Sequence, residues 1–296
     1  MCLTHQVIYF VFKSSTSTCS GFAYSGDSGW YIESTANWYK AQRERESILT
    51  FTDAAAILAN PHLAMWHTHR NQRPSDPDHW MFGIKPYAMH TFLTYLTEEA
   101  GVEKNIVPDG FYAKTDLSPQ EYLYTRIGAK KMRKIFADWA AHNTGGMDYI
   151  TKLQLQRAYL EITYVKGWDY YHPFVWSSLN QGTNGDWFSP PANMNARGWA
   201  YNVFNINNTE TATYHFELEG NATGSQGAAS FFLGRLVVMS NDNPVYLDMT
   251  MRSALSGTAT VSVKPEDSSL FLTVVSVPEF FSGNQHYGYQ VKITKQ

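Results

Sequence analysis

Tryptophan is confined to the first two thirds of the chain, and this asymmetry constrains the fold more than any single motif. All nine tryptophans of the 296 residues lie at or before Trp199. The residues that follow are instead rich in Val, Thr, Ser, Asn and Gly. Because a sharp change of composition is typical of a boundary between separately packed regions, the sequence predicts two domains, residues 1–199 and 200–296.

The second region has the pattern of an antiparallel β-sandwich. Short runs rich in β-branched and aromatic residues are separated by Gly, Asn, Asp, Ser or Pro, and the run from Thr258 to Val263 alternates cleanly. Several short strands divided by turn residues within one region favour a sandwich. Strands are expected over residues 212–219, 230–239, 245–252, 258–264, 269–277 and 287–293.

The first region is mainly helical in pattern. Ser118-Pro119-Gln120-Glu121 has the form of a capping box, and apolar residues follow it at helical spacing as far as Asn143. Further helices are expected over residues 33–45, 85–100 and 147–158, and a long surface loop from Gln181 to Gly198. The predicted fold class is therefore α+β, a mostly helical domain followed by an antiparallel β-sandwich.

Composition excludes several classes of protein. No apolar run approaches the roughly 20 residues of a transmembrane helix, and the run from Val7 to Phe12 lacks the flanks of a signal peptide. The net charge is −3, from 23 basic and 26 acidic residues, so the chain has no electrostatic footprint for nucleic acid. Two cysteines allow at most one bridge. We expect no nucleic-acid partner and no transmembrane segment.

Two short segments have the spacing of a zinc site. In His-Glu-x-x-His peptidases, two histidines one helical turn apart bind zinc, and the intervening glutamate is the general base for the zinc-bound water. Here His5 stands at the first histidine position, Gln6 at the general-base position and Tyr9 at the second histidine position. Trp30-Tyr-Ile-Glu33 then opens the next expected helix, with Ala36 one turn further on.

On these residues the chain resembles gluzincin-type zinc metallopeptidases, in particular an uncharacterised microbial secreted family that joins a helical peptidase-like domain to a C-terminal β-sandwich. The resemblance implies that Glu33 is the third zinc ligand. The zinc motif is degenerate, because Gln6 cannot accept a proton and the Tyr9 phenol, with a pKa near ~10, is a poor ligand. The sequence thus predicts weak or no zinc binding, no ordinary zinc proteolysis, and binding of a peptide or a glycan.

The resemblance also implies a secreted or cell-surface location. Gluzincins usually carry a strand-rich half before the zinc helix, and its edge strand holds the substrate. This sequence reaches its motif at His5, so either the chain is a fragment or the cleft has one wall.

Other interpretations stay open. His67 and His69, with His79, form a weaker alternative metal cluster, although the polar segment around them is also typical of a loop that caps a helix. Glu33 also suits a plain helix start, because acidic residues favour the first turn. The rival functions are an active metal-dependent hydrolase that uses His5 and Glu33, and a surface adhesion or structural protein. Asn207 and Asn221 each lie in an N-glycosylation acceptor pattern.

Overall fold

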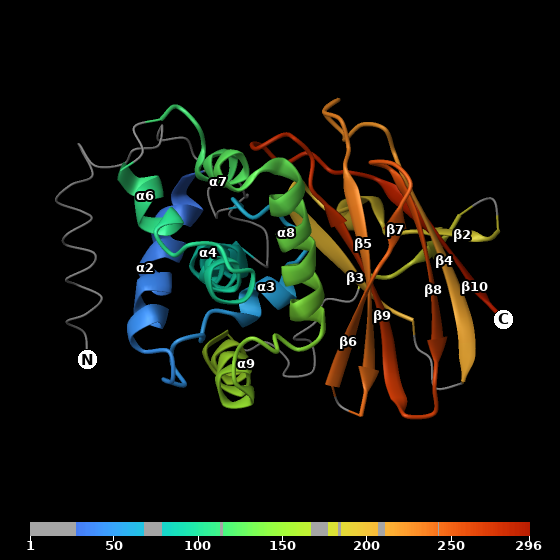
Figure 1. Cartoon of the computed structure of the whole chain (residues 1–296), viewed down its shortest axis with the longest axis horizontal. Coiled ribbons are helices and arrows are strands. Elements are labelled where there is room, and N and C mark those ends of the chain that lie inside the picture. Colours follow the sequence, from blue (N-terminus) through green and yellow to red (C-terminus); the bar gives the residue numbers. More distant parts are fainter. Residues whose placement is uncertain are drawn as a thin grey trace. The chain divides into compact units, whose positions relative to one another are not determined.

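The computed structural model describes residues 28–67, 79–112, 115–166, 177–182, 185–206, 211–241 and 243–296 (Figure 1). The chain forms two compact units. The first comprises Met1–Ile57, Trp66–Met132 and Lys152–Tyr170, and its described elements are helices. The second comprises Leu58–Met65, Arg133–Thr151 and Tyr171–Gln296, and it holds all the described strands.

The described helices are mostly short, and several follow one another with hardly a gap. Their bounds are α2 Gly29–Arg43, α3 Ala55–Ala59, α4 His79–Ala88, α5 His90–Thr94, the π-helix η3 Tyr95–Glu99, α6 Ile106–Tyr112, α7 Pro119–Ile127, α8 Ala129–Thr144, α9 Lys152–Lys166 and the 3₁₀ turn η4 Ala192–Met194. Helix α8 begins in the first unit and continues into the second.

Helix boundaries follow the sequence signals in part. The predicted cap is confirmed, because the Ser118 hydroxyl accepts a hydrogen bond from the Glu121 amide at 3.4 Å and Pro119 is the first residue of α7. The prediction of one continuous helix from there to Asn143 was wrong, because the structure has two helices. It breaks between α7 and α8 at Gly128, whose φ of 91° suits glycine and interrupts a helix.

Two other expected helices differ from the structure. The single helix expected over residues 85–100 is divided among α4, α5 and η3, with Pro86 inside α4. A proline removes one backbone hydrogen bond of a helix and is a common cause of such a break. The helix expected at residues 147–158 begins only at Lys152, as α9.

The strands form two antiparallel sheets that share one apolar core. One sheet has the order β1-β2-β10-β4-β8-β7 and the other the order β3-β9-β5-β6. Their bounds are β1 Asn180–Gln181, β2 Trp187–Ser189, β3 Ala200–Asn205, β4 Ala212–Gly220, β5 Phe232–Ser240, β6 Asn243–Asp248, β7 Thr250–Met251, β8 Ser256–Val263, β9 Asp267–Ser276 and β10 Tyr289–Lys295.

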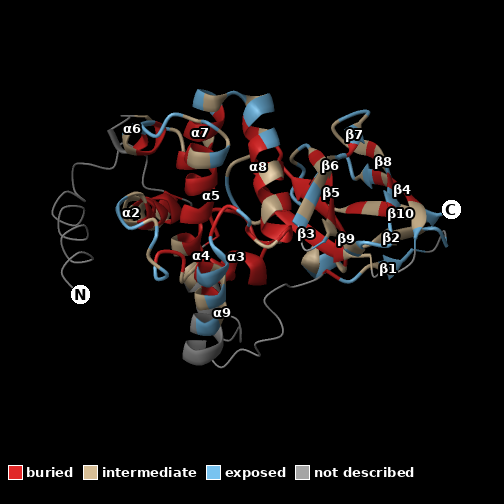
Figure 2. Ribbon diagram, turned by 60° about the horizontal axis from the view of Figure 1, so that its bottom comes forward, coloured by how far each residue is buried: buried red, intermediate tan, exposed pale blue. Residues whose placement is uncertain are grey.

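The core of the sandwich takes side chains from both sheets. Phe216 and Val291 enter it from the six-stranded sheet, and Leu236 and Leu272 enter it from the four-stranded sheet. Buried and more exposed residues alternate along β4, which is the pattern of a strand with one face on a core (Figure 2). The predicted α+β class with antiparallel sheets is confirmed.

The expected surface loop at residues 181–198 is partly a β-structure. Strands β1 and β2 pair with each other, and β2 pairs with β10, so this segment supplies the edge of the six-stranded sheet. The second compact unit also includes residues of α8 and Leu58–Met65. The second unit therefore includes segments that precede residue 200. That residues 200–296 fold independently stays a prediction.

Candidate functional site

Glu33, the predicted third zinc ligand, lies on helix α2. Trp30, one turn earlier, is fully buried, as are Ser34 and Thr35. Glu33 and Ala36, in contrast, are only half-buried. Glu33 and Ala36 are thus less buried than the neighbouring Ser34 and Thr35 on α2.

The buried side of α2 is held by hydrogen bonds to four neighbouring segments. The Trp30 indole donates to the Gln120 side chain at 2.9 Å, and the Tyr31 hydroxyl donates to the Val107 carbonyl at 2.9 Å. Further along, Ser34 donates to the Pro86 carbonyl at 2.5 Å, and the Trp38 indole donates to the Thr97 hydroxyl at 3.1 Å. Because these partners come from α4, η3, α6 and α7, the orientation of Glu33 on α2 is well defined.

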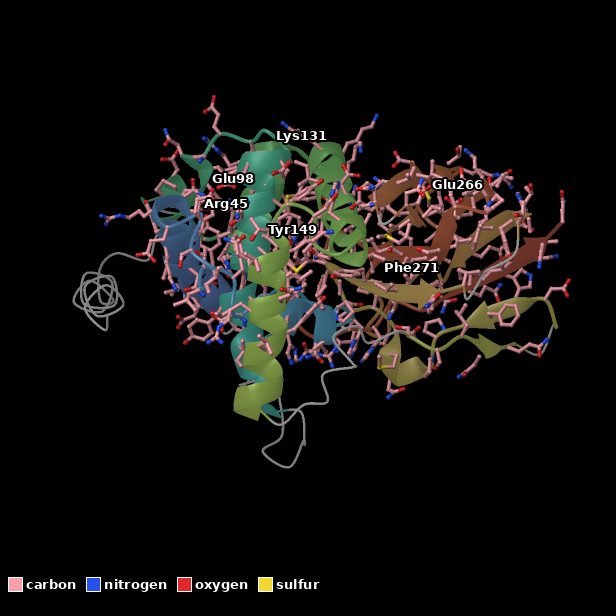
Figure 3. All side chains as sticks on the ribbon, turned by 90° about the horizontal axis from the view of Figure 1, so that it is seen from below. Arg45, Glu98, Lys131, Tyr149, Glu266 and Phe271 are labelled. Carbon is pink, nitrogen blue, oxygen red and sulfur yellow. The ribbon has the colours of Figure 1, made fainter. Side chains whose placement is uncertain are left out.

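A polar cluster fixes the other end of α2. Arg45 Nε lies 3.0 Å from Glu98 Oε2, and the two side chains are labelled in Figure 3. Gln42 donates to Glu98 Oε1 at 2.7 Å and accepts from Lys104 Nζ at 2.5 Å. All four groups are therefore engaged with one another, and the arrangement is that of a clamp between α2 and η3 rather than a binding site.

His90 is a titratable side chain that the sequence interpretation did not single out. It is fully buried, its Nδ1 lies 2.8 Å from the Tyr87 carbonyl, and its ring stacks on Phe51 with 5.2 Å between centroids. Desolvation by burial, with smaller contributions from the positive charges of Lys40 and Arg45, lowers its pKa to about 4, although the Tyr87 carbonyl partly opposes this shift. A neutral, enclosed imidazole of this kind is a core residue.

Most of the predicted ligand residues lie outside the part of the chain that the structure describes. His5, Gln6 and Tyr9 lie outside the described residues, as does His69. His67 is 1% exposed, which places it in the interior rather than in an open site. His79 is the first residue of α4.

The chemistry of the predicted donor groups can still be compared with that of known zinc sites. Within the described ranges, no three His, Cys, Asp or Glu side chains gather as a metal-binding group. Glu33 supplies one carboxylate, and His5 with Tyr9 would add an imidazole and a phenol. Catalytic zinc sites usually have three protein ligands drawn from His, Glu, Asp and Cys, so this donor set is a poor match for zinc.

One half-buried aromatic residue, Trp187, was missed because its segment has the sequence pattern of a loop. Trp187 lies in β2, within a stretch rich in Gly, Asn and Pro that carries no strand signal. Phe188 next to it packs against the sandwich core, so Trp187 lies on the opposite face of the six-stranded sheet. The turn residues on both sides of Trp187 could have indicated that this tryptophan lies near the surface.

These features define an α+β protein with a helical unit built around α2 and an antiparallel sandwich. The chain belongs to DUF6055, a family of unknown function whose model matches residues 2–295. No curated protein matches the sequence. Among solved structures, the chain is similar to a family GH115 4-O-methyl-α-glucuronidase with specificity for decorated arabinogalactans.

The likeness to the glucuronidase is slight. The two chains are 12% identical with a TM-score of 0.21, over 88% of this chain and 41% of the glucuronidase chain. At that level the likeness carries no argument about fold or activity. Within the described ranges, every helix is too short or too polar to cross a lipid bilayer.

Proposed function

We propose that the protein is a metallopeptidase-like binding protein with a degenerate zinc site, and that it holds a peptide without cleaving it by a zinc-water route. The observation that carries the proposal is the position of Glu33, half-buried on a helix that is otherwise fixed on its buried side. A helix fixed in this way holds the Glu33 backbone in one place, which supports Glu33 as the acidic ligand of a peptidase-like site.

The loss of hydrolysis follows from the two other positions of the motif. Gln6 stands where a general base would remove a proton from the nucleophilic water, and a neutral amide cannot accept that proton. Tyr9 stands where the second imidazole would bind, and a protonated phenol is a weak donor near neutral pH. A site with these replacements lacks both high metal affinity and a general base.

Zinc content tests the proposal. We expect purified wild-type protein to hold well under one zinc per chain by elemental analysis. The double variant Gln6→Glu with Tyr9→His restores a second imidazole, so we expect its zinc affinity to rise by about two orders of magnitude, equivalent to about 3 kcal/mol.

Two matched variants separate the contributions. Gln6→Glu with Tyr9→Phe restores the carboxylate but no imidazole, and should leave zinc affinity low. Adding Glu33→Gln to the Gln6→Glu, Tyr9→His variant should abolish most of the gain. Stoichiometric zinc in the wild type that is lost in His5→Ala would overturn the degenerate-site proposal. No gain in the double variant would mean that His5 and Glu33 do not form a ligand set.

A further inference from the structure

The six-stranded sheet has a face that does not contribute to the core. Tyr214, Phe216 and Leu218 of β4 are buried in the sandwich. Because side chains alternate along a strand, His215 and Glu217 lie on the other side, and both are only half-buried. We call this side the polar face. It is made by the outward residues of β2, β10, β4, β8 and β7, and the strands that carry it are shown in Figure 1.

The strand register arranges the polar face in rows that cross the sheet. In antiparallel sheets, directly paired residues point to the same side. One row begins with Trp187 at β2 and crosses to Thr250 at β7, and two shorter rows lie on either side of it. The rows are Trp187–Lys292–Glu217–Thr258–Thr250, Gln290–Glu219–Ser256 and Thr294–His215–Thr260.

Trp187 is the aromatic member of this face. Its side chain is half-buried, and its indole makes no hydrogen bond or ring contact within the part of the chain that the structure describes. A large ring that is partly exposed on the outer face of a sheet offers its electron-rich face to a ligand. The C–H groups of a sugar ring carry the small positive charge that such a face attracts.

The polar face carries few charged groups. Lys292 Nζ lies 3.3 Å from Asp186 Oδ2, and Gln290 Nε2 donates to Glu219 Oε2 at 3.1 Å. His215 Nδ1 lies 3.0 Å from the Thr260 hydroxyl. Lys292 and Asp186 offset each other, so the carboxylates of Glu217 and Glu219 leave the face with a net negative charge, which disfavours an anionic ligand. The amide, carboxylate and hydroxyl groups are donors and acceptors that suit a ligand rich in hydroxyl groups.

We propose that the polar face binds a neutral polysaccharide, with Trp187 as its stacking platform and the adjoining rows as hydrogen-bonding partners. Neighbouring strands are about 4.8 Å apart, so a row across five strands extends for about 19 Å, which accommodates several sugar units. This site lies on the sandwich and is independent of the zinc-site proposal for α2.

Affinity gel electrophoresis of the full chain tests this site. The gels would contain hydroxyethylcellulose, galactomannan or arabinoxylan as neutral polysaccharides, and polygalacturonate as an anionic one. We expect at least one neutral polysaccharide to retard the wild-type protein. Trp187→Ala should weaken that binding at least tenfold, and Trp187→Phe should retain part of it, because a smaller ring still stacks.

The matched control is Tyr246→Ala. Tyr246 is also a half-buried aromatic of the sandwich, but it lies on β6 of the other sheet, and its hydroxyl donates to Asp148 Oδ2 at 2.8 Å. We expect this variant to bind as the wild type does, with circular dichroism as the check of folding. The proposal is overturned if no neutral polysaccharide binds, if only polygalacturonate binds, or if Trp187→Ala binds as tightly as the wild type.

Discussion

His90 is held as a neutral core residue by its surroundings in the helical unit. The stacked Phe51 ring and the Tyr87 carbonyl leave no room for water around the imidazole, which is fully buried. Burial disfavours the charged form, and the pKa of about 4 lies below the ordinary value of 6.5. Between about pH 4 and pH 6.5, His90 therefore binds a proton in the unfolded chain but not in the folded protein.

This difference predicts a pH-dependent stability. Above about pH 6.5 the imidazole is neutral in both states and folding pays no penalty. As the pH falls from about 6.5 to about 4, the unfolded state binds a proton that the folded state does not. The free energy of unfolding should therefore fall by about 3 kcal/mol over this range. Urea unfolding of the full chain at a series of pH values measures this loss.

Variants identify the histidine responsible. His90→Leu should remove most of the pH dependence, whatever its effect on stability at pH 7. His286→Gln is the matched control, because burial and Arg197 also lower the pKa of His286 but its ring is less completely buried. We expect the control to remove a smaller part. An unchanged slope in His90→Leu would contradict the assigned cause.

At the scale of elements, helix α8 is joined to strand β5 by a buried arginine. The Arg235 side chain is 5% exposed, and its Nη2 donates to Asp138 Oδ1 at 2.8 Å while its Nε donates to the same oxygen at 3.2 Å. Asp248 Oδ1 also lies 3.2 Å from Nε, but its side chain is 62% exposed. Both carboxylates face one guanidinium, so they provide a matched comparison of a partly buried and an exposed partner.

We expect Asp138→Asn to destabilise the protein by about 2 kcal/mol, because it leaves a buried guanidinium without its closest opposite charge. Asp248→Asn should cost less than about 1 kcal/mol, since exposed pairs are screened by solvent. Chemical denaturation of both variants measures the two changes. If both variants lost the same stability, the charge of Arg235 would not depend on Asp138 for its stabilisation.

Strands and helices could be predicted from the sequence where the spacing of their apolar residues matched the residues that are buried in the structure. Strands β4 and β10 begin and end close to their predicted bounds, and in each of them a core face alternates with a more exposed face. Strand β3 lacked that signal, since five of its six residues are buried and no alternation remains. The apolar residues keep their helical spacing on both sides of Gly128, so the sequence pattern predicts one helix. The break between α7 and α8 results from the positive φ of Gly128, which this pattern does not reveal.

The candidate site was predictable to a lesser degree. Trp30 and Glu33 were placed correctly on a helix, and the structure adds that Trp30 is buried while Glu33 is half-buried. Their meeting with His5 and Tyr9 depends on tertiary packing, which a spacing of residues cannot specify. Trp187 was assigned to a loop because its flanking Gly, Asn and Pro residues are typical of turns.

At the scale of the whole molecule, the two compact units have different proposed roles. The helical unit carries Glu33 and the proposed degenerate metal site, whereas the sandwich carries the polar face. The two proposals stand on separate observations, so zinc content and polysaccharide binding can fail independently. The secreted or cell-surface location implied by the resemblance to gluzincin-type peptidases stays a prediction.

The central claim is that Glu33 converges with His5 and Tyr9, and an experimental structure that resolves residues 1–27 tests it most directly. We predict that the Glu33 carboxylate lies within about 10 Å of both the His5 and Tyr9 rings in the wild type, close enough for small adjustments to bring metal-ligand contact. In the Gln6→Glu, Tyr9→His variant soaked with zinc, the ion should lie about 2 Å from Glu33 and from both imidazoles. A wild-type structure with Glu33 more than about 10 Å from both rings, well beyond ligand reach, would contradict the claim.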